Sequence, residues 1–456
     1  MLQERATEIN DRLRRLRAPV RRLRPRLPRP RRRGVLVYLA MMGPGFITAS
    51  AGNDAGGIAT YAKAGAVYDD KLLWAMVVTA VSLIVVQEMC ARMGAVTGKG
   101  LSDLIREEFG IGWASLAMLC LLIANGAITA SEFVGIKAAT LVLQGRQDGG
   151  PAALLPIVVV ILCAVGLWWL VTRSARGPVE RVLLAMTLVF LAYIPAALTS
   201  QHDWGRLLRH IVTPSLGDVH SPGMLAFLIA LVGTTISPYM QFYVQSSVVE
   251  KGVTIRDYRY TRVEVIVGSL FAILIAMFII IATSAALYGH GNYNNVADAG
   301  VFATALRGIL GSWAELLFAL GLFGASLLAA AVLPLSTAFA ICEVFGFESG
   351  VDKSFGEAPI FNGLFTGLIA GGALVALVLP PDVLVNVLVD TQAINGVILT
   401  VVLLFILRLV NNRRLMGDYT NGPVFNAVAF ASVGVLVVLT ALLIPGALFN
   451  IGPAAG

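Results

Sequence analysis

The stretch that decides the fold is residues 43–57, which read GPGFITASAGNDAGG. Glycines, a proline and an acid here interrupt an apolar run over residues 35–66 at its middle. A helix that unwinds inside a bilayer frees backbone carbonyls and amides. These groups are tolerated only where they line a cavity or contact an ion, a substrate or water. The stretch therefore predicts a membrane helix that is broken at a binding site, with Asp54 at the break.

A second apolar run, over residues 223–249, is interrupted by the sequence GTTISPY at positions 233–239. It is the sixth apolar segment of the chain, five segments after the first. Breaks at corresponding positions of two halves are typical of secondary transporters built from an inverted repeat, with the substrate site between the breaks. We therefore expect a five-plus-five inverted repeat followed by one further helix.

The composition agrees with a protein that crosses the membrane many times. Of the 456 residues, 57% are hydrophobic and 13% are charged, whereas a soluble domain carries about 25% charged residues. These values exclude an ordinary cytosolic enzyme, a disordered chain and a nucleic-acid-binding domain. The four cysteines are far apart and predict neither disulfides nor a metal site. We expect an all-α polytopic membrane protein, with eleven spans near residues 35–66, 71–95, 112–142, 152–172, 177–199, 223–249, 263–288, 309–342, 359–379, 382–410 and 424–449.

Residues 1–34 form a basic arm with 13 arginines. Prolines in the arm disfavour a stable helix, and we expect it to lie on the anionic lipid of the cytoplasmic leaflet rather than to bind nucleic acid. With the N-terminus inside, 27 of the 34 Lys and Arg residues fall on the cytoplasmic side and 7 on the outer side. This asymmetry predicts a plasma (inner) membrane protein with a cytoplasmic N-terminus and an extracytoplasmic C-terminus. We divide the chain into the arm 1–34, spans 1–5 of the first repeat at 35–199, spans 6–10 of the inverted repeat at 223–410, and span 11 at 424–449.

Two acids in the middle of predicted spans are candidate functional residues. A carboxylate near the bilayer centre costs at least about 2.5 kcal/mol, so it normally marks a pathway or a site. Asp54 lies in the first break beside Asn53, and Glu132 lies in the middle of the third span. Glu88 and Arg92 are four residues apart near the inner end of the second span, which is typical of an ion pair within one helix.

The four histidines all fall in predicted connections, where we interpret them as surface residues rather than a transmembrane proton relay. Three of them, with two acids, also allow an external metal-collecting patch of irregular spacing, which consists of His202, His210, His220, Asp203 and Asp218.

Several blocks of the sequence resemble the Nramp divalent-metal transporters. They are GPGF at 43–46, followed by the acid of the first break, AKAGA at 62–66, KLLW at 71–74, ARMGAVTGK at 91–99 and RRLMG at 413–417. The resemblance runs from about residue 35 to about residue 420. It implies a LeuT-like fold with broken helices 1 and 6, and import of divalent metal ions by alternating access. It implies neither an enzymatic activity nor a cofactor besides the transported ion.

The resemblance also implies a set of metal ligands, but this sequence departs from the family motifs. The family's Asp-Pro-Gly-Asn reads DAGG at 54–57, and its Met-Pro-His reads SPY at 237–239. A second histidine of the sixth span aligns with Val244, and the third-span Asp-x-x-Glu reads TASE at 129–132. The implied metal site consists of Asp54, the carbonyls of Ala51 and Thr234, Gly57, Ser237 and Gln392. Further candidates are Asn53, Thr235 and Tyr239 as lining residues and Glu132 as a proton-carrying or structural acid.

The departures from the motifs change the metal preference. Thioether sulfur is a soft ligand that favours transition metals, so Ser237 in its place leaves a site made of oxygen donors. Gly57 and Ser237 are also small, which leaves room for an ion that keeps much of its water. Magnesium dehydrates reluctantly and is usually held by one or two carboxylates plus waters, whereas calcium takes roughly 6–8 oxygens. We therefore expect magnesium, with manganese as a second permeant ion, as in the Nramp-related magnesium transporter branch that the sequence resembles.

Loss of both sixth-span histidines and of the third-span aspartate removes the groups best able to carry protons near neutral pH. We expect uptake without obligatory proton coupling, driven by a membrane potential. A potential of about 100 mV shifts the equilibrium of a divalent ion by roughly three decades. Glu132 is the group that still allows coupling, so a proton-coupled manganese or iron importer is the alternative.

Other functional classes fit the sequence less well. A sodium-coupled carrier of an organic solute normally binds a substrate carboxylate with helix N-termini, and Asp54 would repel that carboxylate. An intramembrane enzyme would need paired aspartates, a nucleophile elbow or a metal-binding histidine pair, and the sequence has none of these motifs. The loops contain no ligand-binding domain that would indicate a receptor or a channel.

Overall fold

The computed structural model describes residues 54–144, 154–173, 193–199, 203–214, 222–289, 299, 301–302, 311–351 and 353–448. Helices joined by short turns make up the described ranges. The α-helices are α4 (Ala55–Tyr68), α5 (Leu73–Thr97), α6 (Leu101–Phe109), α7 (Ile111–Leu143), α8 (Leu154–Arg173), α10 (Tyr193–Thr199), α11 (Trp204–Val212), α12 (Pro222–Thr235), α13 (Pro238–Glu250), α14 (Tyr258–Leu287), α16 (Trp313–Phe345), α17 (Pro359–Val378), α18 (Leu384–Val410), α19 (Arg413–Met416) and α20 (Pro423–Leu448). The 3-10 turns are η1 (Asp69–Leu72), η5 (Pro381–Val383) and η6 (Gly417–Tyr419).

Nine helical segments of the described ranges are long and apolar enough to cross a membrane. The first of them, Ala55–Thr97, contains two predicted spans, because η1 joins α4 directly to α5. The predicted fifth span, 177–199, is described only at its end, by α10. The arm at 1–34 and the first half of the first span, residues 35–53, lie outside the described residues.

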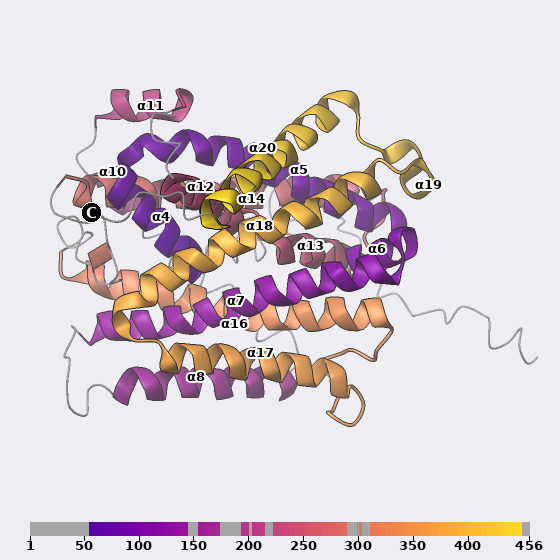
Figure 1. The fold of residues 1–456 in the computed structure, drawn as a ribbon, viewed down its shortest axis with the longest axis horizontal. Coiled ribbons are helices and arrows are strands. Elements are labelled where there is room, and N and C mark those ends of the chain that lie inside the picture. The colour runs from indigo at the N-terminus through magenta and orange to yellow at the C-terminus, as the bar shows by residue number, and fades with distance from the viewer. Residues whose placement is uncertain are drawn as a thin grey trace, which may run out of the picture.

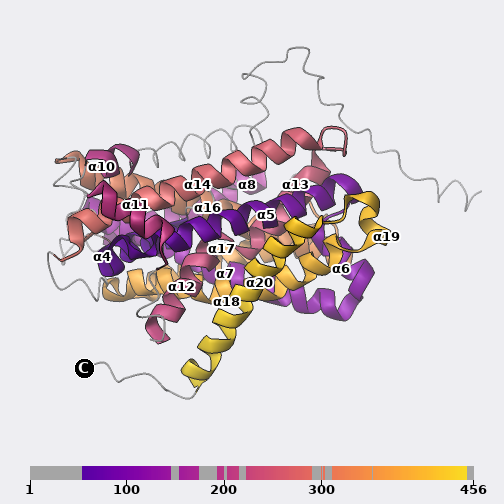
Figure 2. The same ribbon diagram turned by 90° about the horizontal axis from the view of Figure 1, so that it is seen from above.

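The helices of the bundle form two groups. Helices α7, α8, α16 and α17 pack on one another and run side by side in the lower half of Figure 1. Helices α4, α5, α12, α13 and α14 form the second group, in which α5 and α14 lie next to each other in Figure 2. Helix α18 contacts α7 in the first group and α4 and α12 in the second, and α20 packs on its outer side. Side chains of α18 therefore reach both groups at once.

Glycines allow α12 and α18 to approach closely. A Cβ atom at Gly233 would collide with the backbone of Gln392 and Gly396, and one at Gly396 would collide with the carbonyl of Ile229. Small residues at such contacts are common where membrane helices pack, because they let backbones meet. The contact places the side chains of α18 directly against the end of α12.

Polar contacts stabilise the C-terminal end of α4, next to Tyr68. Asp69 ends α4 at a φ of 60°, a region that residues other than glycine seldom adopt. Its carboxylate accepts hydrogen bonds from Arg206 Nη2 at 2.6 Å and from Ser284 Oγ at 2.5 Å. The buried carboxylate of Asp70 lies 2.5 Å from Nδ1 of His210. These contacts join the turn between α4 and α5 to α11 and α14.

The hypothesis of an external metal-collecting patch gains no support from the described residues. His210 lies on α11 rather than in a connection, and its ring is engaged with Asp70. Asp203 caps the N-terminus of α11, because its Oδ1 accepts from the backbone N–H groups of Gly205 and Arg206. No group of three or more His, Cys, Asp or Glu residues in the described ranges is placed to hold a metal ion. The other members of the patch, His202, His220 and Asp218, lie outside those ranges.

The predicted ion pair between Glu88 and Arg92 is confirmed, with Arg92 Nη2 3.1 Å from Glu88 Oε2. The pair also connects three helices. Arg92 donates to the carbonyl of Tyr419 at 2.6 Å, and its guanidinium lies over the ring of Phe425 at the start of α20. Tyr258, the first residue of α14, donates its hydroxyl hydrogen to Glu88. The buried pair therefore ties α5 to α14 and α20.

The short helix α6 packs its first turn against the end of α16. Ser102 donates a hydrogen bond to Glu343, and Arg106 Nη1 donates to the carbonyl of Val344 at 2.6 Å. Asp103 lies next to Glu343, and partial burial followed by repulsion from Glu107 raises the pKa of Asp103 above its usual value. The ionised form of Asp103 is therefore less favourable in the folded protein than in the unfolded chain.

We expect Asp103→Asn to raise the thermal unfolding midpoint at about pH 8 and to leave it unchanged near pH 3. A carboxyl whose pKa is raised by folding contributes stability below its unfolded pKa of 3.8, and this contribution is lost as the pH rises through the folded pKa. Midpoints measured by fluorescence in detergent at the two pH values check this. An equal shift at both pH values would contradict it.

Candidate functional site

The carboxylate of Asp54 lies at the N-terminus of α4, with the whole residue 1% exposed. Asp54 is the N-cap, and its Oδ1 accepts a hydrogen bond from the backbone N–H of Gly57 at 2.5 Å. The first amides of a helix have no partner within the helix, and a negative charge there is stabilised by the helix dipole. The second carboxylate oxygen has a long contact of 3.4 Å with Gln392 Nε2, and the side chain of Thr234 also lies next to the carboxylate. Asp54 therefore has a capping role and still has an oxygen that can bind a cation.

Glu132 of α7 meets Asp54 at the same helix end. Its Oε2 accepts a hydrogen bond from the backbone N–H of Ala55 at 3.2 Å, and the side chain is fully buried. Glycine at position 135 permits this contact, since a Cβ there would collide with the side chain of Ala55. Two buried carboxylates thus share one helix N-terminus, where like charges disfavour double ionisation unless a cation or a proton is bound. The sequence identified both acids but did not predict that they meet.

The predicted break of the sixth span is confirmed. Helix α12 ends at Thr235 and α13 begins at Pro238, so Ile236 and Ser237 lie outside helical structure. The hydroxyl of Ser237 lies 3.1 Å from the carbonyl of Gly233 and 3.3 Å from that of Thr234, and it donates to these acceptors. The predicted ligands Thr234 and Ser237 are therefore adjacent, and each keeps acceptor capacity for an ion or its water.

Helix α18 brings two carboxamides to the two breaks. Gln392 Nε2 lies 3.4 Å from both carboxylate oxygens of Asp54. Gly56 makes room for this amide, because a Cβ at position 56 would collide with it. One turn further, Asn395 Nδ2 donates to the carbonyl of Gly233 at 2.7 Å and to Ser237 Oγ at 3.0 Å. Gln392 thus contacts the first break and Asn395 the second.

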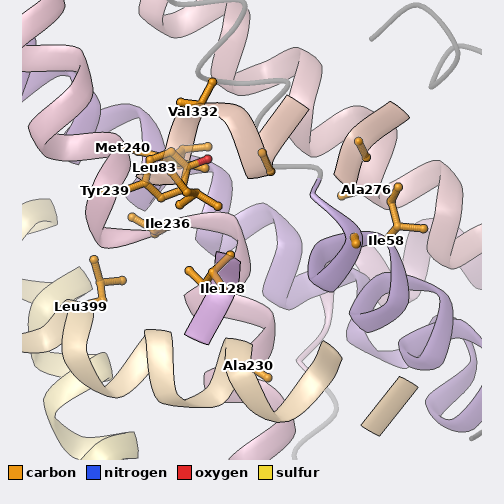
Figure 3. Close-up of a cluster of buried hydrophobic side chains, with 14 of the residues drawn as sticks. Ile58, Leu83, Ile128, Ala230, Ile236, Tyr239, Met240, Ala276, Val332 and Leu399 are labelled. Atoms are coloured by element: carbon orange, nitrogen blue, oxygen red, sulfur yellow. The ribbon is translucent and has the colours of Figure 1, made fainter. Parts of the chain in front are cut away.

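Of the predicted lining residues of the sixth span, Thr235 is hydrogen-bonded within α12 and to α4, and Tyr239 lies near Asp54 and Glu132. The hydroxyl of Thr235 donates to the carbonyl of Leu231 at 2.7 Å and accepts from the hydroxyl of Tyr61 at 2.9 Å, which ties α12 to α4. Tyr239 is buried in an apolar cluster with Leu83 and Met240 (Figure 3). The sulfur of Met240 therefore belongs to the hydrophobic core.

The structure brings five predicted residues together through α4, α12 and α18. They are Asp54, Gly57, Thr234, Ser237 and Gln392, with Glu132 beside them. The predicted ligand Ala51 and the lining candidate Asn53 lie outside the described residues. Asn395 was missed, although its position three residues after Gln392 places both amides on one face of a helix. That spacing is the signal that identifies it.

Comparison with known proteins agrees with this arrangement. The family model for natural resistance-associated macrophage protein-like (Nramp) proteins matches residues 45–445. The divalent metal cation transporter MntH of Klebsiella pneumoniae is 27% identical over 425 residues, which are 91% of this chain and 96% of the relative. MntH of Yersinia pestis is 30% identical over 298 residues, or 64% of this chain and 69% of the relative.

Two solved structures show that the fold is shared. A manganese transporter of Eremococcus coleocola matches with a TM-score of 0.72 at 19% identity, over 93% of this chain and 91% of that one. MhsT in complex with L-phenylalanine matches with a TM-score of 0.61 at 15% identity, over 88% and 98%. The predicted LeuT-like fold is therefore confirmed. Since the family model covers most of the chain, this multi-pass membrane protein belongs to the Nramp family.

Proposed function

We propose that the protein imports divalent metal ions by alternating access, with magnesium as the main substrate and manganese as a second one. The observation that carries the proposal is the buried carboxylate of Asp54, with oxygen donors around it at two helix ends. Curated relatives over most of the chain are divalent metal cation transporters, a class without enzymatic activity, which supports the coarse assignment. Asp54 supplies the negative charge that a divalent cation needs.

The preference for magnesium rests on the chemistry of the donors. The groups of the described ranges that converge on the breaks are a carboxylate, carbonyls, a hydroxyl and carboxamides. Magnesium and manganese suit such oxygen ligands, whereas sulfur ligands select softer metals. Magnesium also keeps several waters when it binds proteins. The proposed substrate is therefore an ion that reaches Asp54 still partly hydrated.

The proposed driving force is the membrane potential. The N-terminus and its basic arm lie in the cytoplasm on anionic lipid, and the C-terminus lies outside the plasma membrane, as the Lys and Arg distribution indicates. A specific observation favours the alternative of a proton-coupled manganese or iron importer, because Glu132 is a second buried carboxylate at the Asp54 site. A proton on Glu132 would relieve the repulsion between the two acids.

Asp54→Asn separates the charge of Asp54 from its capping role. Asparagine keeps the oxygen that accepts from the Gly57 N–H but loses the charge, whereas Asp54→Ala loses both. We expect both variants to bind magnesium about 100-fold more weakly or worse, and the alanine variant alone to lose thermal stability. Isothermal titration calorimetry and detergent unfolding curves measure the two effects. Wild-type magnesium affinity in Asp54→Asn would refute the role of Asp54.

The double variant Gly57→Asn with Ser237→Met tests the oxygen-donor proposal. A thioether at the break is expected to raise the affinity for cadmium about tenfold or more and to lower that for magnesium. The size-matched control, Gly57→Asn with Ser237→Leu, adds similar bulk without sulfur and is expected to gain no cadmium affinity. Competition of cadmium, manganese and calcium against magnesium uptake in proteoliposomes gives the affinity of each ion relative to magnesium. If the sulfur-containing variant gains nothing over its control, Ser237 does not face the ion.

Proton coupling is tested with a pH-sensitive dye inside proteoliposomes. Magnesium uptake at a fixed membrane potential is expected to leave the internal pH unchanged, and Glu132→Gln is expected to keep transport within about threefold of the wild type. Acidification that tracks uptake and disappears in Glu132→Gln would instead establish the proton-coupled alternative.

A further inference from the structure

Three carboxamides at or next to the breaks are fully buried, and the oxygen of each lacks a hydrogen-bond partner among the described residues. They are Gln392 and Asn395 of α18 and Gln241 of α13. Gln241 Nε2 donates to the backbone carbonyl of Ser237 at 3.0 Å, so it holds the same residue that Asn395 binds. In all three amides the nitrogen is bonded while the oxygen has no partner among the described residues, a pattern that Gln245 and Asn125 share away from the breaks. The position of the three amides at or next to the breaks is what sets them apart. Buried acceptors without partners are rare in native proteins and call for an explanation.

The orientation of each amide is determined by its neighbours. The nitrogen of Gln392 faces the carboxylate of Asp54, that of Gln241 faces a backbone carbonyl, and that of Asn395 faces the carbonyl of Gly233. Carboxylates and carbonyls only accept hydrogen bonds, so a flipped amide would place its own oxygen against another acceptor. The oxygen is therefore the free end of each amide. Each amide thus offers an acceptor without a partner, whereas its nitrogen faces an acceptor.

Acceptors without partners beside the breaks suit a hydrated cation. Water bound to a metal directs its hydrogen atoms outward, so the hydration shell presents donors on all sides. A bare transition metal is bound instead through direct contacts to its ligands, whereas magnesium retains water. We propose that the oxygens of Gln392, Asn395 and Gln241 accept hydrogen bonds from the water of the transported ion, so that Asn395 and Gln241 select for hydrated magnesium. This inference rests on the proposed function and adds two residues that recognise the ion without touching it.

The first experiment uses cobalt(III) hexaammine as a probe, with the purified full-length protein in calorimetry. Its six ammonia ligands donate hydrogen bonds as the water of hydrated magnesium does, and they do not exchange. We expect it to compete with magnesium in the wild type. Failure to compete, in a wild type that binds magnesium, overturns this inference and leaves the proposed function intact. A wild type that binds no magnesium overturns the proposed function itself.

The second experiment compares Gln241→Met with the matched control Gln245→Met. Both glutamines are buried on α13, and both nitrogens donate to a backbone carbonyl, but Gln245 binds Lys99 at the end of α5 rather than the break. We expect Gln241→Met to lower the affinity for magnesium about tenfold and to abolish competition by cobalt hexaammine. The affinity of Gln241→Met for manganese is expected to change by less than about threefold. Gln245→Met is expected to bind both ions as the wild type does.

Asn395→Leu is a second variant with the same expected loss of the magnesium preference, and unfolding curves verify that each variant is folded. An equal loss of affinity for magnesium and manganese in both site variants would overturn the inference, because general damage to the site would weaken the binding of both ions alike. The same loss in Gln245→Met would also overturn it, because that amide does not contact the break.

Discussion

The N-terminus of α4 inside the bundle is the feature on which the rest of the site depends. Its unpaired amides bind two carboxylates, with Asp54 capping Gly57 N–H and Glu132 of α7 accepting from Ala55 N–H. Helix amides and the helix dipole stabilise negative charge where water is scarce. This arrangement keeps an acid buried inside the bundle without a permanent basic partner in the described ranges. An acid held in this way remains available to a passing cation.

The packing of the central helices follows from this requirement. Small residues let backbones meet around the acid, as at Gly56 against Gln392, at Gly135 against Ala55 and at Gly233 against Gln392 and Gly396. Membrane helices associate through such close contacts and through polar bonds, since lipid supplies no hydrophobic driving force between them. Helix α18 contributes to both breaks and packs on both helix groups, so its amides lie where the two groups meet.

The fold was largely predictable because its signals are local. Apolar length predicted the spans that lie in the described ranges, and the GTTISPY stretch at 233–239 predicted a break where the structure has one between Thr235 and Pro238. Spacing of four residues predicted the Glu88–Arg92 pair. The bonds between distant segments were not predictable. Glu132 and Ala55 are 77 residues apart in the sequence, so their contact could not be predicted from spacing. The role of Asn395 depends on the packing of α18 against α12, which the sequence does not specify.

The most direct measurement is a high-resolution structure of the protein in a lipid environment with magnesium. We expect one ion bound to an oxygen of Asp54 at about 2.0–2.1 Å, with ordered water between the ion and the amide oxygens of α18. Magnesium density away from Asp54, or an ion stripped of water and bound directly by those amides, would contradict it.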